Sequence, residues 1–250
     1  MPIKAYTTLA LLSLTALPLA AQQPAPPLES KPIAIDREQA YVGKRVFRVV
    51  NEGADAGLIT VHSRFNEAGQ YLLHDLSDSD ALGIREEIFA VLDGDSFAPI
   101  RNQVHARMGA TYIDVNWGWQ GLDASSQIEI YNFDSGEHRF LERPKTMPAA
   151  TLTRASALYL VNAMDLAEGK VIEFNWFNTM NGQIAPISYT VTGSQEITVP
   201  AGTYDSFVVV QEGGLPGNTI YVSKDKPRRI VRFDVTGMDM QLELMPEAEG

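Results

Sequence analysis

Apolar and polar residues alternate over most of the chain, which is the pattern of β-strands that bury one face. In the stretch 58–65 the apolar residues Ile59, Val61 and Phe65 are separated by polar ones. Clusters rich in Gly, Asn and Asp, such as 66–69, interrupt the alternating stretches and are typical of hairpin turns. The pattern therefore predicts about a dozen strands joined by short turns.

The stretch 188–234 carries the clearest hairpin signals in the chain. Its runs of β-branched and aromatic residues are closed by Pro, Gly, Asn and Asp. Pro200 cannot donate a ladder hydrogen bond and Gly202 tolerates a positive φ, so we expect the chain to turn there. Further upstream, Asp93 followed by Gly94 predicts a type I′ hairpin turn.

One segment, 151–166, departs from the strand pattern. Its apolar residues recur at helical spacing, namely Leu152, Ala155, Leu158, Tyr159 and Val161. Thr151 or Thr153 could cap the start of a helix. The whole pattern predicts a mainly all-β protein with a strongly curved antiparallel sheet or an incomplete β-barrel. We expect the one helix to pack on the sheet or in it.

The first residues are typical of a secretory signal peptide. Lys4 precedes an apolar run that reaches Leu19, and Ala20 and Ala21 supply small residues for cleavage. We expect residues 1–21 to be removed on export, which would leave the protein in the periplasm or outside the cell.

The remaining chain reads as a linker followed by one domain. Residues 22–32 contain four prolines in a short polar run, which suits an extended linker. Residues 33–250 then form a single antiparallel β domain in this prediction. The best internal boundary is 143–150, which contains two prolines.

Composition narrows the possible partners. The chain contains no cysteine, so disulfides and attachment of a lipid to a lipoprotein cysteine are excluded. Its formal net charge of −11 disfavours nucleic acid and anionic membranes. After the signal segment no apolar stretch approaches the roughly 20 residues of a membrane-spanning helix. We expect no integral membrane span and no cofactor.

Two motifs resemble a family of exported bacterial β proteins known as a domain of unknown function, similar in architecture to lipoprotein-localisation factors. The first is Val-Thr-Gly-Ser-Gln-Glu-Ile-Thr-Val-Pro-Ala-Gly-Thr-Tyr at 191–204. The second is Tyr-Val-Ser-Lys-Asp-Lys-Pro-Arg-Arg-Ile-Val at 221–231. A weaker likeness covers 158–169. The resemblance implies a half-barrel with a concave apolar face and no established active site.

Aromatic side chains are the first candidates for a binding site. The candidates for an apolar site are Trp117, Trp119, Phe174, Trp176, Tyr189 and Phe207. Aromatic and Met side chains on a concave face would suit acyl chains or other apolar ligands. The alternative is an ordinary core that the helix and these side chains fill.

Basic residues gather in one hairpin of this acidic chain. The candidates for an anion site are Lys224, Lys226, Arg228, Arg229 and Arg232. If Arg228 and Arg232 share a face, their guanidinium groups could hold a phosphate or carboxylate head group. The alternative, which we favour, is a solvated turn whose charges protect a sheet edge from aggregation.

His62 and His74 flank the turn at 66–69 and raise the question of a metal. They would lie opposite each other if Phe65 paired with Tyr71, and two imidazoles at that separation could share a zinc ion. A register shifted by one residue would instead bury His74 with its leucine neighbours. We favour the shifted register, because it buries more apolar surface, and we expect no metal site.

Carboxylates occur in pairs, but their positions do not favour catalysis. The pairs are Asp78 with Asp80, Glu86 with Glu87, and Asp93 with Asp95. The aspartates lie in predicted turns, and the adjacent glutamates would point to opposite faces of a strand. A glycosidase needs two carboxyls that face each other, and no Gly-x-Ser-x-Gly motif supports a serine hydrolase. We therefore expect no catalytic residues.

The sequence favours a non-enzymatic exported β domain that binds a lipid-like or other apolar small molecule on the concave face of a half-barrel. The alternative is a structural or protein-interaction module of the cell envelope with a filled core, which would bind another envelope protein. An exported hydrolase is a minor alternative.

Overall fold

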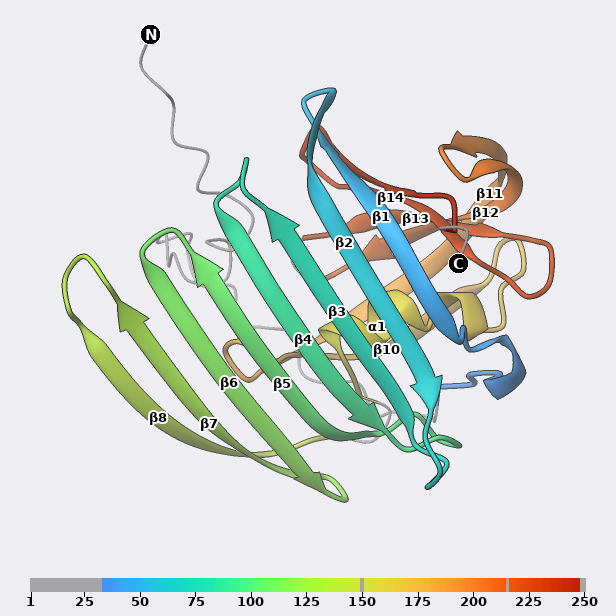
Figure 1. The fold of residues 1–250 in the computed structure, drawn as a ribbon. Coiled ribbons are helices and arrows are strands. Elements are labelled where there is room, and N and C mark those ends of the chain that lie inside the picture. The colour runs from blue at the N-terminus through green and yellow to red at the C-terminus, as the bar shows by residue number, and fades with distance from the viewer. Residues whose placement is uncertain (1–32, 149–150, 215, 248–250) are drawn as a thin grey trace, which may run out of the picture.

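The computed structural model describes residues 33–148, 151–214 and 216–247. These residues form one sheet of fifteen strands, against which a short helix packs (Figure 1). The expected signal peptide at 1–21 and linker at 22–32 lie outside this described part of the chain.

The first eight strands lie one after another in the first part of the chain. They are β1 (Gly43–Asn51), β2 (Ala54–Phe65), β3 (Tyr71–Ser79), β4 (Ile84–Leu92), β5 (Pro99–Met108), β6 (Thr111–Gln120), β7 (Asp123–Asn132) and β8 (His138–Thr146). The second half contains β9 (Thr151–Thr153), α1 (Arg154–Tyr159), β10 (Val171–Asn178), β11 (Gln183–Val199), β12 (Gly202–Glu212), β13 (Asn218–Ser223), β14 (Ile230–Val235) and β15 (Met240–Leu244). Two 3-10 helices, η2 (Arg37–Gln39) and η3 (Val161–Ala163), precede β1 and follow α1.

The sheet follows the order of the chain except at one seam. Its order is β8-β7-β6-β5-β4-β3-β2-β1-β15-β14-β13-β12-β11-β10-β9. The seam is the antiparallel pair of β1 with β15, in which Phe47 lies opposite Leu244. Because the order ends at β8 and at β9 among the described residues, the barrel is incomplete, as the sequence predicts. The short parallel pair of β9 with β10 is a departure from the expected antiparallel sheet.

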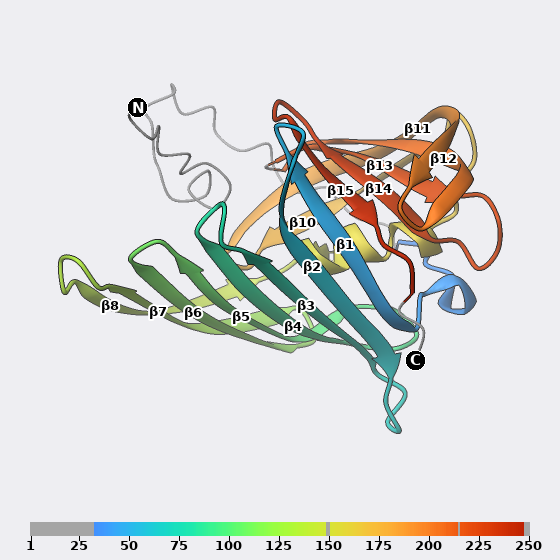
Figure 2. The ribbon, with the colours of Figure 1, turned by 45° about the horizontal axis from the view of Figure 1, so that its top comes forward.

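Two arms of the sheet face each other across α1. Figure 2 shows the long strands up to β8 spread as one broad arm and β10 to β15 folded back beside it. Hydrogen bonds tie the helix to both arms. The hydroxyl of Tyr159 on α1 donates to Asp75 of β3, and the hydroxyl of Tyr189 on β11 donates to the carbonyl of Ala157 on α1.

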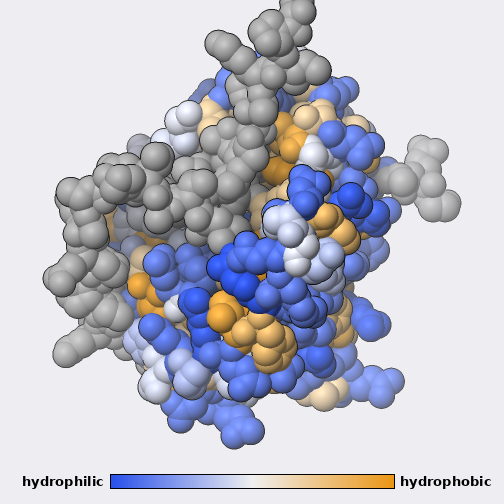
Figure 3. Space-filling model, turned by 90° about the vertical axis from the view of Figure 1, so that its left-hand side faces the viewer, coloured by the Kyte–Doolittle hydropathy of each residue, from blue (hydrophilic) through white to orange (hydrophobic). Residues whose placement is uncertain are grey.

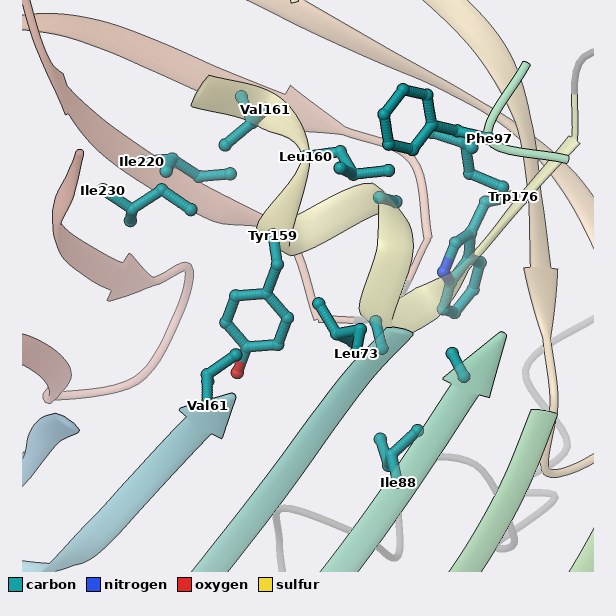
Figure 4. Close-up of a cluster of buried hydrophobic side chains, with 14 of the residues drawn as sticks. Val61, Leu73, Ile88, Phe97, Tyr159, Leu160, Val161, Trp176, Ile220 and Ile230 are labelled. Carbon is teal, nitrogen blue, oxygen red and sulfur yellow. The ribbon is translucent and has the colours of Figure 1, made fainter. Parts of the chain in front are cut away.

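The core lies on the concave face, where the alternating apolar positions converge. On β6 the alternating residues Ile113, Val115, Trp117 and Trp119 are all buried. Figure 4 shows α1 passing above the strands, with Tyr159 directed towards Val61 and Leu73 below it. The helix therefore fills the concave face, as the helical spacing at 151–166 predicts.

The α-helix is shorter than the segment 151–166, over which apolar residues recur at helical spacing. Thr153 is the N-cap and its hydroxyl accepts from the N–H of Ser156, so one of the two predicted caps is confirmed. The α-helix ends at Tyr159, and the chain continues as η3. Asn162 lies in that turn, where its amide donates to the carbonyls of Gln39 and Arg228. Leu160 and Val161 are fully buried, so this segment packs on all sides.

The two predicted turns have different outcomes. Gly202 has a φ of +135°, which confirms the expected positive φ after Pro200. The prediction of a type I′ turn at Asp93 and Gly94 is wrong, because the loop extends to Ala98. Phe97, with a φ of 55°, is fully buried there, and its burial in the core requires the longer loop.

β8 lies at a free edge of the sheet and is its most exposed strand. Met147 donates its N–H to the carbonyl of Leu122, so the odd-numbered residues on this side of the pair form the hydrogen bonds to β7. The even-numbered residues of β8 therefore direct their backbone N–H and C=O groups away from β7. Pro144, which has no N–H, is one of these. Figure 3, which shows this side of the molecule, has apolar patches among hydrophilic ones. Phe133 and Phe140 are each 58% exposed.

Candidate functional site

A cavity of about 170 Å³ lies between the two arms of the sheet. Its apolar walls include Leu58, Ile59, Met108, Trp176, Ile187 and Leu242. Polar side chains from β3, β4 and α1 reach the same space, so one region of an otherwise apolar cavity carries charge. Apolar walls with a few convergent polar groups are typical of small-molecule sites.

Asp75 is the most unusual of these polar residues. It is 5% exposed and lies on the concave face of β3, where its strand neighbours Leu73 and Tyr71 are fully buried. Its carboxylate accepts from the hydroxyl of Tyr159 at 2.9 Å and from that of Ser77 at 3.2 Å. Both partners are neutral donors.

Glu86 and Arg154 form an ion pair beside Asp75. Arg154 donates through both terminal nitrogens to the carboxylate of Glu86, at 2.5 and 3.4 Å. The side chain of Glu86 is 13% exposed and that of Arg154 is 37% exposed. Both line the cavity. The first residue of α1 is thus fixed to the broad arm by a fork-shaped pair.

Burial shifts the protonation equilibria of this group. Loss of hydration raises the pKa of Asp75 to about 6, and the nearby charge of Glu86 adds to that rise. Burial also raises the pKa of Tyr159 well above its usual value, with a further contribution from Asp75. The charge of Glu86 is the main reason that the pKa of Arg154 is raised. The cavity therefore holds a carboxyl group that titrates near neutral pH.

The structure separates the aromatic candidates instead of gathering them. Trp176 and Tyr189 line the cavity. Phe174 is fully buried and its ring lies 5.2 Å from that of Tyr189. Phe207 lies on β12, half-buried, beneath the basic side chain of Arg228. Only part of the predicted set can touch a ligand in this cavity.

Trp117 and Trp119 lie away from this cavity and line a second hollow, of about 850 Å³, together with residues of β7 and β8. The indole of Trp117 donates to the carbonyl of Thr179 at 2.7 Å. Phe177 packs edge-on against both indoles, with ring centroids 4.7 Å from Trp117 and 5.8 Å from Trp119. Neither tryptophan lines the cavity. Trp117 and Trp119 are 2% and 8% exposed, so the two indoles contribute to the hydrophobic core as well as to the wall of the second hollow.

The basic hairpin carries charges that its neighbours largely offset. Its ion pairs are Lys224 with Asp205 at 3.1 Å, Arg229 with Glu247 at 3.3 Å, and Arg232 with Asp234 at 2.5 Å. Arg228 donates to the carbonyl of Met164 at 3.0 Å and holds that loop. Lys226 is exposed. The five candidates are not directed at a common point.

A third hollow, of about 330 Å³, lies beside Lys226 and Arg228. Asp36 and Asp165 line it as well. Two acidic residues therefore face the two basic ones, which does not favour an anion.

The register between β2 and β3 differs from the one we favoured. Phe65 pairs with Tyr71, and His62 lies directly opposite His74. Both histidines are on the outer face, and Asp75 takes the inward position that the shifted register gave to His74. The polar contacts of Asp75 with Tyr159 and Ser77 compensate for the apolar surface that the shifted register would bury.

His74 is engaged with a carboxylate on the next strand. Its Nε2 lies 2.7 Å from Glu87. In the part of the chain that the structure describes, no three His, Asp or Glu residues are grouped so that they could hold a metal ion.

The site residues Asp75, Arg154 and Tyr159 were not among the sequence candidates. Asp75 lies at an inward position of the alternation. Acidic residues are usually exposed, so the sequence favours an outward position for it. Glu86 was weighed only as a member of a carboxylate pair, and the expectation that Glu86 and Glu87 point to opposite faces holds. One sequence feature does indicate the site: Asp75 lies two residues after Leu73 and four after Tyr71, so the three share one face of the strand.

A family model for a protein of unknown function, DUF3108, matches residues 76–242. The match spans more than half of the chain and both arms of the sheet. The chain belongs to the DUF3108 family. The sequence resemblance to a domain of unknown function with a barrel-like architecture is thereby confirmed. No curated protein matches the chain.

Among solved structures, the chain is similar to the crystal structure of a β-barrel-like protein of the domain of unknown function DUF1849 from Brucella abortus. The TM-score is 0.50 and the identity 8%, over 81% of this chain and 95% of that one. This likeness concerns the fold, an incomplete barrel, and nothing more. The crystal structure of MucB in complex with MucA(peri) gives a TM-score of 0.16 at 12% identity, over 80% of this chain and 85% of that one. A TM-score this low does not indicate a shared fold.

No helix among the described residues of this DUF3108 protein is long and apolar enough to span a membrane.

Proposed function

We propose that this protein is an exported, non-enzymatic binding protein that holds an apolar or amphiphilic ligand in the cavity between its two arms. The observation that carries the proposal is the cavity, which combines apolar walls with a small polar group of Asp75, Glu86 and Arg154. The N-terminal sequence, with Lys4 before an apolar run, supports export.

The size of the cavity limits what can enter it as it stands. About 170 Å³ is close to the roughly 150 Å³ of an engineered cavity that binds benzene, and it is below the roughly 300 Å³ of typical ligand pockets. The cavity therefore suits a single ring or the end of an acyl chain. A complete lipid would require the arms to move apart.

Two measurements test the proposal. Native mass spectrometry of protein purified from the envelope of its own host should show a bound small molecule. Calorimetric titration of the protein with toluene should show one saturable site. Absence of both a co-purified ligand and toluene binding would contradict the proposal.

A pair of tryptophan variants locates the site. Trp176→Ala enlarges a wall of the cavity and should change the affinity for toluene. Trp119→Ala makes the same chemical change outside the cavity, in the wall of the second hollow, so a folded variant should bind toluene in the cavity as the parent does. Equal effects of the two substitutions would place the bound toluene elsewhere.

A second candidate function, docking of another envelope protein, is favoured by the free edge of β8. Phe140 lies on that edge and is 58% exposed, next to unpaired backbone groups that an added strand could use. A photo-crosslinking residue at position 142 should then give one specific product in the envelope. The same residue at position 53, in the β1–β2 turn, is the control. Identical products from the two positions would count against docking at the edge.

A further inference from the structure

The polar end of the cavity has an excess of negative charge. Asp75, Asp78 and Glu86 contribute three carboxylates, and Arg154 contributes one guanidinium. Arg154 is committed to Glu86, at 2.5 Å. No Lys, Arg or His of the described chain lies within salt-bridge distance of Asp75. Its hydrogen bonds come from the hydroxyls of Tyr159 and Ser77.

The nearest further cation does not change this balance. Arg45 on β1 is 3% exposed, and its guanidinium lies 4.1 Å from the ring centroid of Tyr41 and 5.8 Å from that of Tyr159. It acts on the ring of Tyr159 and makes no ion pair with Asp75. The groups that face Asp75 are thus Ser77 on its own strand, Glu86 on β4, and Arg154 and Tyr159 on α1.

A buried carboxylate that is held only by neutral donors is costly when ionised, because neutral hydrogen bonds replace its hydration incompletely. A ligand ammonium group would supply the missing charge and donate up to three hydrogen bonds. A ligand carboxylate would add a further negative charge and would have to displace Glu86 from Arg154. Charge therefore discriminates between ligands that fit the same apolar space.

We propose that the cavity selects a small amine, in which an ammonium group pairs with Asp75 and an apolar group about the size of a phenyl ring occupies the space beside Trp176. This inference rests on the proposed function and names its ligand class. The apolar part follows from the volume of about 170 Å³, and the cationic part from the unpaired carboxylate.

The test compares three ligands of nearly equal shape: phenethylamine, 2-phenylethanol and 3-phenylpropanoate. Calorimetric titrations at pH 7.5 should show the amine binding about tenfold more tightly than the alcohol, because a charge-assisted hydrogen bond contributes roughly 1.5 kcal/mol or more. The carboxylate should bind most weakly. Equal affinities for the amine and the alcohol, or tightest binding of the carboxylate, would overturn the inference.

Two variants assign the effect to Asp75. Asp75→Asn should reduce the affinity for the amine to that for the alcohol and leave the alcohol unchanged. Asp134→Asn removes the same charge from the exposed β7–β8 turn and should leave every affinity unchanged. If the two substitutions weaken amine binding equally, the overall charge of the protein and not Asp75 selects the amine, which would overturn the inference.

The parent protein provides a test that does not depend on the folding of a variant. The ratio of amine to alcohol affinity should fall about tenfold from pH 7.5 to pH 5, because Asp75 becomes protonated while the amine stays charged. A constant ratio would contradict the assignment. If toluene binds but the amine binds no more tightly than the alcohol, the proposed binding function stands and the inference that the cavity selects an amine fails. If toluene does not bind either, the proposed function fails as well.

Discussion

The hydroxyl of Tyr159 donates to the carboxylate of Asp75 across 2.9 Å, and this bond joins the last residue of α1 to the middle of β3. Both side chains are buried, at 3% and 5% exposure. The helix that fills the concave face is therefore held by a polar contact as well as by apolar packing. Changes in the charge of Asp75 act on the helix and on the cavity together.

Asp75 should make the protein less stable as the pH rises. Its pKa is about 6 in the folded protein against 3.8 in the unfolded chain, so between these values the folded state binds more protons. The stability that this group contributes is complete below about pH 3.8 and is lost as the pH rises through 6. The difference in unfolding free energy between the parent and Asp75→Asn should fall by about 2 kcal/mol from pH 4 to pH 7.

Urea denaturation at several pH values measures this difference. Asp134→Asn is the control, because Asp134 is an exposed aspartate in the β7–β8 turn, outside the cavity. Its difference from the parent should vary little with pH. A flat profile for Asp75→Asn would mean that the Asp75 carboxyl keeps an ordinary pKa.

The pair of Arg154 and Glu86 should show strong coupling in a double-mutant cycle. Removal of Arg154 leaves the carboxylate of Glu86, with 13% of its side chain exposed, without its cation. We expect a coupling energy of at least about 1 kcal/mol between Arg154→Met and Glu86→Gln. The exposed pair of Arg139 with Glu137 is the control, for which about 0.5 kcal/mol or less is expected. Equal coupling in the two cycles would show that burial adds nothing to the cavity pair.

Gly94 should not tolerate a side chain. A Cβ at this position would lie 1.7 Å from the carbonyl oxygen of Gly69, so the two loops would have to move apart. We expect Gly94→Ala to lower the unfolding free energy by about 1 to 3 kcal/mol, in the range for overpacked sites. At Gly118 a Cβ would meet nothing within 4 Å. Thermal unfolding should show a clear loss for Gly94→Ala and little change for Gly118→Ala.

Gly202 should resist substitution for a different reason. A Cβ there would make only ordinary contact with the ring of Tyr204, at 3.7 Å, but the φ of +135° disfavours any β-branched residue. We expect Gly202→Val to cost about 1 kcal/mol or more. An unchanged melting temperature would show that the turn after Pro200 adapts to the new residue.

The sequence predicted the strands well, because alternation and turn residues are local signals. The inward position of Val61, the helix cap Thr153 and the turn at Gly202 agree with the alternation and the turn residues. The loop after Asp93 was missed because its conformation depends on the burial of Phe97, which no local signal shows.

The site was predicted only in part, because it depends on which strands meet. The sequence placed Trp176 and Tyr189 among the apolar candidates but grouped them with Trp117, which does not line the cavity. Asp75 was missed because its partners come from α1, and the sequence cannot show that Tyr159 reaches β3. The register of His62 with His74 was misjudged for the same reason, since the polar contacts of Asp75 offset the apolar gain of the shifted pairing.

The seam between β1 and β15 has a consequence for the order of folding. Most strands of the sheet pair with neighbours in the chain, so each arm can form from local hairpins. The seam instead joins Phe47 to Leu244, near opposite ends of the described chain. Contacts between residues so distant in sequence form slowly, because a long loop must close first. Since the cavity needs both arms, ligand binding should appear only in the last kinetic phase of refolding, after most of the strand content has formed.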